Sequence, residues 1–223
     1  WEMRNRPNID LKHADIIRDR SQYARYVAPI SEWYTSVKRD DDDISGVRVT
    51  GTTNEYALIS TAEIDKGRFF SNSESHSGSR VAVIGKDIKD ALFENEQAIG
   101  NKIRIGNYTF RVIGEVEKQG KFLGMFSMDK QIIIPLGTHQ RLFTRRGWTG
   151  INVKVAESDL NDATEELTAM MRQLRHIRPS KENNFALNRQ DPFKEQYAMI
   201  KLAIGGTGLF ITILSLVVGG IGI

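Results

Sequence analysis

The sequence predicts an α+β protein whose water-soluble part is followed by a transmembrane helix. Three observations support this fold class. Residues 202–223 form an apolar run that contains no charged side chain, whereas 26% of the whole chain is charged, an ordinary value for a globular protein. The soluble part mixes short strand-like segments with amphipathic helical ones. Without the apolar run, roughly 200 residues remain, enough for one domain or two small ones.

The apolar run Leu202–Ile223 has the length of a membrane helix. About 22 helical residues cover roughly 33 Å, which matches the ~30 Å hydrocarbon core of a bilayer. Small side chains recur along it at steps of three and four, namely Gly208, Thr212, Ser215, Gly219 and Gly222. Such a stripe lets a second membrane helix approach closely. We expect packing against both lipid and protein; the alternatives are a buried core helix and an apolar tail.

Composition excludes several classes of function. The net charge of +3 is too small to argue for nucleic acid, and the linear sequence has no basic stripe with interleaved aromatic residues. Without cysteine, the chain can form neither disulfides nor thiolate metal sites. It starts at Trp1 without a signal-peptide pattern. We therefore expect a piece of a longer protein.

The first third of the soluble part predicts a helix and then strands. Asp10 can cap a helix over Leu11–Ala24, and Ile30–Val37 has the β-branched and aromatic residues of a strand. The acidic run Asp40–Asp43 lacks the spacing and glycine of an EF-hand loop, so a solvated hairpin tip is expected. Val47–Thr50 and Tyr56–Ile59 are expected as strand pieces.

The middle of the chain predicts a connector followed by strands and a helix. Ser71–Ser79 is rich in serine and is expected to be a linker. Val81–Ile84 predicts a strand and Lys86–Phe93 a helix. The dipeptide Gly106-Asn107 predicts a hairpin turn between two strands, Ile103–Ile105 and Tyr108–Ile113.

The segment Lys118–Asp129 is an unusual loop because it carries five large apolar side chains: Phe122, Leu123, Met125, Phe126 and Met128. Either these side chains fold back on the core or they form an exposed contact surface for a partner. Beyond this loop, Ile132–Ile134 predicts a strand and Thr138–Phe143 a short helix.

The last soluble segments predict a strand and the clearest helix. Ile151–Val155 alternates as a half-buried strand does, and apolar residues then recur at helical steps from Leu160 to Ile177. Phe185–Leu187 is expected as a return strand, and Phe193–Lys201 as an amphipathic link into the membrane run.

Catalytic motifs are lacking. The sequence has no GxxxxGK[ST] phosphate loop, and its histidines, at 13, 76, 139 and 176, lack an HExxH pattern or an i, i+4 partner. We interpret each as an ordinary surface or helix-end histidine. A serine beside His76 lacks the strained turn and orienting acid of a hydrolase. The sequence therefore predicts no catalytic, cofactor or metal site.

Seven short segments, in order, carry a family resemblance: Val49–Tyr56 (VTGTTNEY), Gly67–Phe70 (GRFF), Val81–Gly85 (VAVIG), Ala98–Ile105 (AIGNKIRI), Phe110–Gly114 (FRVIG), Ile134–Leu136 (IPL) and Val217–Ile223 (VVGGIGI). With them the chain resembles the extracytoplasmic part of permeases in macrolide-exporter-like (MacB-type) ABC transporters, a group that includes lipoprotein-release and FtsX-like permeases. The segments span most of residues 47–223, whereas the first 46 residues match poorly.

The resemblance implies two lobes. An α/β lobe would comprise residues 1–66 and 148–195, with a mostly β lobe at 67–147 inserted in it. A link at 196–201 and the start of the second membrane helix, 202–223, would follow. The resemblance also implies location at a bacterial inner membrane, with the soluble part outside the cytoplasm.

The implied mechanism is mechanical. ATP, bound by a partner subunit or domain, would move the membrane helices, and the extracytoplasmic lobes of two permease protomers would respond by exporting or releasing a cargo. An adaptor and an outer-membrane channel sometimes assist. Two alternatives stay open: a single-span membrane-anchored sensor or binding domain, and a membrane-anchored hydrolase. Neighbouring genes and further membrane helices would separate these classes.

Overall fold

The computed structural model describes residues 9–189 except 61, 95, 123–125 and 144–147. By its contacts the chain separates into Trp1–Phe185 and Ala186–Ile223, and the fold below belongs to the first unit. Its helices are α1 His13–Arg20, α2 Tyr56–Ile59, α3 Asn72–Ser77, α4 Lys86–Phe93, α5 Leu136–Phe143, the 3-10 turn η2 Glu157–Asp159 and α6 Leu160–Leu174. Its strands are β1 Tyr26–Arg39, β2 Asp42–Thr52, β3 Ile64–Gly67, β4 Val81–Ile84, β5 Lys102–Ile105, β6 Tyr108–Val116, β7 Lys121–Phe122, β8 Phe126–Ser127, β9 Gln131–Pro135 and β10 Trp148–Lys154.

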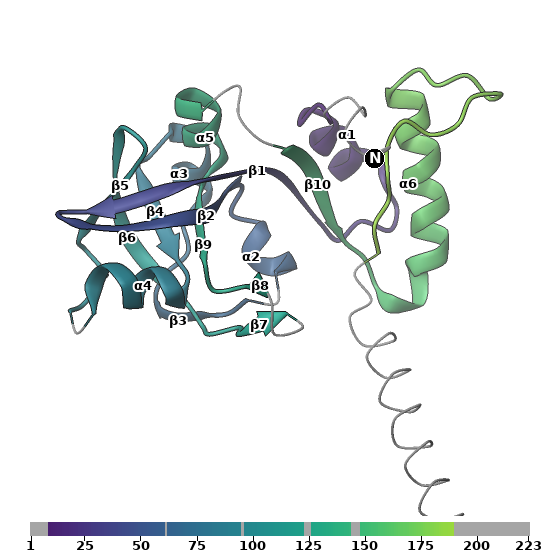
Figure 1. The fold of residues 1–223 in the computed structure, drawn as a ribbon. Helices are drawn as coiled ribbons and strands as arrows, with labels where there is room; N and C mark the ends of the chain where they lie inside the picture. Colours follow the sequence, from purple (N-terminus) through teal and green to yellow (C-terminus); the bar gives the residue numbers. More distant parts are fainter. Residues whose placement is uncertain (1–8, 61, 95, 123–125, 144–147, 190–223) are drawn as a thin grey trace, which may run out of the picture. The chain divides into compact units, whose positions relative to one another are not determined.

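Strands β1, β2, β9, β4, β6 and β5 form a closed ring in that order, because β5 pairs with both β6 and β1. The β2–β9 and β4–β6 contacts are parallel, and the others are antiparallel. Figure 1 shows α5 above and α4 below this ring. We call the ring with α4 and α5 the barrel. Closure removes the exposed edges that an open sheet would leave.

The barrel is filled by side chains that alternate along its strands. Burial in β5 follows the pattern exposed, buried, exposed, buried, so Ile103 and Ile105 face inward. Phe110 and Val112 do the same on β6. The other strand residues of this core are Trp33, Val37, Val47, Val49, Ala82, Ile84, Ile132 and Ile134. Each buried aliphatic or aromatic side chain contributes about 1.5–3 kcal/mol, so this interior is the main stabilising element of the barrel.

Strand β1 takes part in two separate cores. Along one edge its first half pairs with β10 and its end with β5, while β2 occupies the other edge. Trp33 belongs to the barrel interior, but Val27 packs with helices α1 and α6 in a second cluster that includes Ile17, Leu167 and Met171. We call α1, α6, β10 and the first half of β1 the α1–α6 lobe. A strand of this length spans about 45 Å, which allows it to reach both cores.

A third apolar cluster covers part of the outside of the barrel. The outward residues of β4, β6 and β9 in it are Val81, Val83, Ile113, Val116 and Ile133. The chain segment 56–70 lies on them, contributing Phe70 and the half-buried Tyr56, Ala62, Ile64 and Phe69. We call this the covered face. It explains why every position of β4 and β9 is buried and why all of them except Gln131 are apolar.

One long strand bears on the expected lobe boundary. The sequence assigned residues 1–66 to a single α/β lobe, and Trp33, Val37, Val47 and Val49 of this range belong to the barrel interior with residues from 82–143. Strand β1 contributes to both cores, with Val27 in the α1–α6 lobe and Trp33 in the barrel. The division into an α/β lobe at 1–66 plus 148–195 and an inserted lobe at 67–147 stays a prediction.

Most of the individual elements are confirmed. Strand 81–84 and helix 86–93 have the expected bounds, the Gly106-Asn107 turn joins β5 to β6, and the acidic run forms the tip of the β1–β2 hairpin. The predicted Leu11–Ala24 helix is shorter, His13–Arg20. The long helix starts at Leu160 as expected and ends at Leu174.

Three sequence predictions are wrong. Tyr56–Ile59 is a short helix, because the backbone N–H of Tyr56 bonds the carbonyl of Thr53 and starts a turn. The Ser71–Ser79 linker contains α3, which a capping box between Ser71 and Glu74 begins. Phe185–Leu187 forms no strand; Phe185 instead packs into the α1–α6 lobe.

Candidate functional site

Within the described ranges, no group of three or more histidine, cysteine, aspartate or glutamate side chains could hold a metal ion. The four histidines lie on separate elements: His13 on α1, His76 on α3, His139 on α5 and His176 just after α6. His76 Nδ1 contacts the carbonyl of its own helix, at Asn72 O, at 2.9 Å. This arrangement brings no histidine to a second one.

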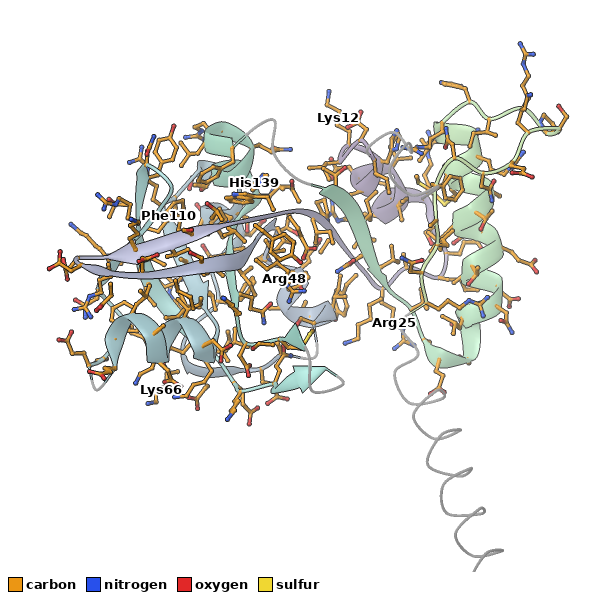
Figure 2. All side chains as sticks on the ribbon, in the orientation of Figure 1. Lys12, Arg25, Arg48, Lys66, Phe110 and His139 are labelled. Carbon is orange, nitrogen blue, oxygen red and sulfur yellow. The ribbon has the colours of Figure 1, made fainter. Side chains whose placement is uncertain are left out.

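His139 is buried, which corrects its interpretation as a surface or helix-end residue. Its side chain is 3% exposed, and its ring lies 4.6 Å from that of Trp33 in the barrel. Figure 2 shows His139 beneath α5, in the same lobe as Phe110. Neither ring nitrogen has a hydrogen-bond partner among the described atoms, and burial lowers the pKa of His139 to about 4. The imidazole is therefore neutral at pH 7 and serves as packing.

The predicted contact loop forms a hairpin arm. Strands β7 and β8 pair antiparallel, with Phe122 opposite Phe126. Leu123 and Met125 lie outside the described residues, as do the side chains of Phe122 and Phe126, and Met128 is half-buried. Whether these five side chains make a contact surface stays a prediction. What the structure adds is the way in which the arm is attached.

Asp129 anchors the base of this arm. Its side chain is 2% exposed, and its two carboxylate oxygens accept the backbone N–H groups of Gln119 at 2.7 Å and Gly120 at 2.9 Å. Ser127 Oγ donates to Asp87 Oδ2 on α4 at 2.6 Å. Charge-assisted bonds to backbone N–H groups are among the stronger hydrogen bonds in proteins. The base of the arm is therefore held firmly to the barrel.

A basic surface lies on another part of the barrel exterior, on β1, β5 and β6. Five exposed cations gather there, and we call them the basic face: Lys38, Arg80, Lys102, Arg104 and Arg111. Strand register explains the gathering. Lys38 pairs with Arg104, and Lys102 pairs with Arg111, while the backbone N–H of Arg111 bonds the carbonyl of Arg80.

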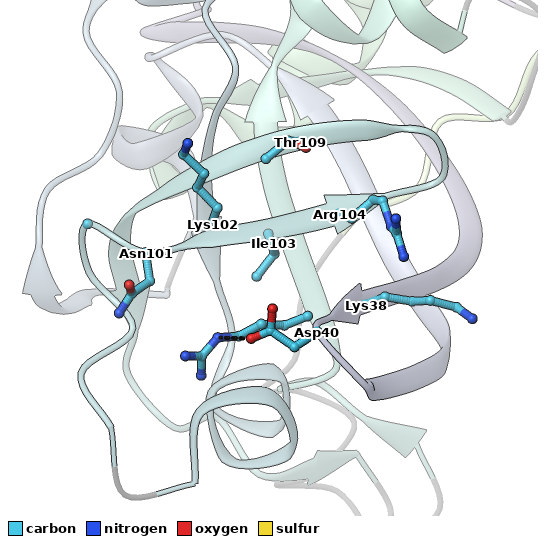
Figure 3. A pocket seen from close by; sticks show the side chains of 9 residues that line it. Lys38, Asp40, Asn101, Lys102, Ile103, Arg104 and Thr109 are labelled. Carbon is cyan, nitrogen blue, oxygen red and sulfur yellow. Dashed lines mark ion pairs between the residues drawn. The ribbon is translucent and has the colours of Figure 1, made fainter.

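Two shallow hollows lie over the basic face. One, of about 530 Å³, is lined by residues that include Lys38, Lys102 and Arg104, and Figure 3 shows these three side chains together with Asp40. The other, of about 520 Å³, is lined by Arg80, Arg111 and again Lys102. Thr109 also lines both hollows. Most of their lining residues are polar or charged, and the two hollows adjoin across neighbouring strands.

Among the described residues, none of the five cations of the basic face forms an ion pair. Arg80 only lies over the ring of Tyr108, 5.7 Å from its centroid. The sequence analysis missed this surface because Lys38 and Arg80 are distant in the chain from the three cations at 102–111. A local signal existed at β5, where the alternation Lys-Ile-Arg-Ile predicts two cations on one exposed face.

The predicted membrane residues lie outside the described part of the chain: Gly208, Thr212, Ser215, Gly219 and Gly222. The link at 196–201 also lies outside it. Within the described residues, no helix has the length and apolar character needed to cross a bilayer. The small-residue stripe and its packing therefore stay predictions.

The sequence pattern of one family, described as MacB-like periplasmic core domain, matches residues 2–170. A macrolide export ATP-binding/permease protein, MacB, of Bdellovibrio bacteriovorus is 32% identical over 79% of this chain and 27% of its own length. A pyoverdine export ATP-binding/permease protein, PvdT, of Pseudomonas syringae pv. syringae is 26% identical over 89% of this chain and 30% of its own length. The chain thus spans less than a third of these relatives.

Solved structures share the fold. The periplasmic region of MacB from Actinobacillus actinomycetemcomitans superposes with a TM-score of 0.71 at 19% identity, covering 87% of this chain and 85% of that one. The extracellular domain of the noncanonic ABC-type transporter YknZ from Gram-positive bacteria gives 0.66 at 14% identity, covering 77% and 86%. At such identities the likeness concerns the α+β fold alone.

Proposed function

This chain belongs to the family of MacB-like periplasmic core domains, and from that membership we propose that its extracytoplasmic domain couples the ATP-driven motion of membrane helices to export or release of a cargo. The family match over residues 2–170 is the observation that carries the proposal. The cargo could be a drug, peptide, lipoprotein or other molecule, since relatives with different names share this domain.

The chain acts without chemistry of its own in this proposal. Relatives that contain a similar region are named ATP-binding/permease proteins, so ATP would be bound by another domain or subunit. The chain itself would need no cofactor or metal. Its partners would be the ATP-binding subunit, a second permease protomer, the lipid bilayer and, in some systems, an adaptor with an outer-membrane channel; nucleic acid is not among them.

Strand β1 suits the mechanical role. It is hydrogen-bonded to β10 at one end and to β5 at the other, and its side chains enter both the α1–α6 lobe and the barrel. A fully paired strand resists extension, because moving its two ends apart breaks ladder hydrogen bonds. Displacement of the α1–α6 lobe would thus be passed to the barrel. The apolar side chains of the hairpin arm would contact an adaptor, a second protomer or a cargo.

The coupling can be tested at the link to the membrane. Insertion of three or four glycines near Tyr197 should make the link flexible, so cargo export falls while ATP hydrolysis by the assembled complex persists. The same insertion between Asp41 and Asp42, at the exposed tip of the β1–β2 hairpin, is the matched control and should leave export intact. Unchanged export after the Tyr197 insertion would contradict the coupling.

The hairpin arm has its own test. Replacing Phe122 and Phe126 with serine should weaken partner binding and leave the melting temperature within a few degrees, because the anchor at Asp129 is untouched. A large drop in melting temperature with normal partner binding would show that the two rings pack on the core.

Cysteines scanned along the stripe Gly208–Gly222 should be shielded from water-soluble thiol reagents; uniform labelling would contradict helix packing in the membrane.

The runner-up function is a single-span membrane-anchored sensor or binding domain. A domain of this kind would need no ATP-binding partner. The basic face is the observation that favours it. The gene context separates the two functions. Three further membrane helices downstream of Ile223, or an adjacent ATP-binding gene, favour the permease.

A further inference from the structure

The basic face keeps like charges opposite one another. Lys102 faces Arg111 across the β5–β6 pair, and Lys38 faces Arg104 across the β1–β5 pair. Directly opposed like charges destabilise a sheet, whereas opposite charges stabilise it. The basic face has two such pairs, and its cations form no ion pair among the described residues. A bound anion would therefore offset the repulsion between them.

The shape of this surface favours a polymer over a small molecule. Pockets for small molecules are concave, mostly apolar and enclose most of the ligand. The two hollows here are shallow, lie side by side and share Lys102 and Thr109. Their lining is dominated by polar and charged side chains. An extended chain that crosses both hollows would contact all of the cations, whereas a small molecule would leave most of them unused.

One acidic residue lines each hollow. Asp40 lines the first hollow and is 3.7 Å from Arg39, and Glu74 lines the second and bonds Arg68 at 2.7 Å. A flat anionic membrane would meet these carboxylates as well as the cations. A short anionic segment can lie between them. The cations extend across β1, β5, β6 and the start of β4, about 15 Å at the usual strand spacing, or four to five extended residues.

The cations lie on both sides of the path that such a peptide would take. Lys102 and Arg104 are two residues apart on one strand, about 7 Å along β5, so a peptide that crosses the strands would pass between them. Three of the five cations are arginines, whose planar donors suit bidentate contact with carboxylates. Thr109, opposite Arg104, adds a neutral hydroxyl.

We propose that the basic face binds an extended acidic segment of a protein partner, which lies across β1, β5 and β6 between Asp40 and Glu74. This inference adds the chemistry of one partner to the proposed permease role. It rests on that role only because the role exposes the basic face to extracytoplasmic proteins. Binding needs no ATP and no cargo.

The test uses the whole purified chain in detergent and a short fluorescent peptide of alternating glutamate and glycine. Anisotropy should show binding at low ionic strength that weakens as salt is added, since exposed charges are screened. Lys102→Glu combined with Arg104→Glu should weaken binding by about tenfold or more. Arg25→Glu combined with Lys181→Glu changes the net charge equally on exposed residues outside the basic face and should change the affinity by less than about twofold.

Three further arms fix the identity of the ligand. The same peptide with glutamine in place of glutamate should not bind. Phosphatidylglycerol added as mixed micelles and inorganic pyrophosphate should compete weakly. Equal binding by both double variants, or none by the unchanged chain, overturns the proposal. Loss of phosphatidylglycerol or pyrophosphate binding in the Lys102→Glu, Arg104→Glu variant, without loss of peptide binding, also overturns it and would assign the face to a lipid surface or a phosphate. Because no arm measures transport, a negative result leaves the permease role standing.

Discussion

The covered face and the basic face are two parts of the outside of one barrel, and they differ in what the chain does with them. The covered face, with Val83 and Ile133, is buried by segment 56–70. The basic face, with Lys102 and Arg104, is exposed. Both arise from strands of the same closed ring. The chain therefore completes one outer face by itself and leaves the other to solvent or to a partner.

Strand β6 belongs to both faces and shows how the change is made. Thr109 and Arg111 near its start are exposed, whereas Ile113 and Val116 near its end are buried in the covered face. Between these parts, the pairing with β4 shifts register between Ala82 and Val83. At Gly114 an added Cβ would lie 2.5 Å from the carbonyl oxygen of Arg68. The backbone of segment 56–70 thus contacts β6 directly, near the point where exposed polar residues are followed by buried apolar ones.

The largest predicted difference between the covered face and the basic face is in the free energy of unfolding when a side chain is replaced by alanine. Ile133→Ala should lower the free energy of unfolding by about 2–5 kcal/mol, because it leaves a cavity under segment 56–70. Thr109→Ala removes a similar outward position on the exposed face and should change stability by less than about 0.5 kcal/mol. Urea unfolding followed by circular dichroism measures both. Comparable losses would mean that the two faces do not differ in burial.

Local patterns explain how far sequence reasoning succeeded. The strand 81–84, the helix 86–93 and the turn at Gly106-Asn107 depend on neighbouring residues, and each was predictable. The capping box from Ser71 to Glu74 is equally local, so α3 was predictable from a signal that the serine-rich composition obscured. These elements supply the parts of the fold, but they do not determine how strands distant in sequence pair.

Long-range pairing explains the rest. The ring closes through β5 and β1, which lie more than sixty residues apart, and no local pattern specifies that contact. The basic face depends on it, since Lys38 and Arg104 meet only after closure. The burial of His139 has the same origin, because α5 comes to lie against Trp33 from a distant strand. The candidate site was therefore much less predictable than the elements that form it.

The second prediction concerns the barrel interior and the dependence of stability on pH. It tests whether water reaches this interior. The folded pKa of His139, about 4, lies below its ordinary value of 6.5. Below pH 6.5 the unfolded state therefore binds a proton that the folded state does not, and stability falls as the pH decreases from about 6.5 to about 4. The loss is at most about 3 kcal/mol over this window.

His139→Leu should remove this pH dependence and raise stability near pH 5, because it eliminates two buried nitrogens without partners. His76→Leu on exposed α3 is the control and should leave the pH dependence in place. Thermal unfolding between pH 4 and 7 measures both variants. A stability curve for the unchanged chain that is flat across this window would show that His139 reaches water in the folded protein.

The last prediction has the smallest expected effect and is the sharpest test of the comparison. The same substitution, lysine to glutamate, should change the free energy of unfolding in opposite directions on two strands. Lys102→Glu replaces a like-charge pair with Arg111 by an opposite-charge pair and should raise the free energy of unfolding by about 0.5–1 kcal/mol. Lys66→Glu on β3 does the reverse, because the exposed Lys66 lies opposite the buried Glu115, and should lower it by at least as much. The shift for Lys102→Glu should shrink in high salt, since both charges of that pair are exposed, and the shift for Lys66→Glu should shrink less. If Lys102→Glu destabilises the chain, the repulsion across β5 and β6 is not real, and the reason to expect an anionic partner on this face disappears with it.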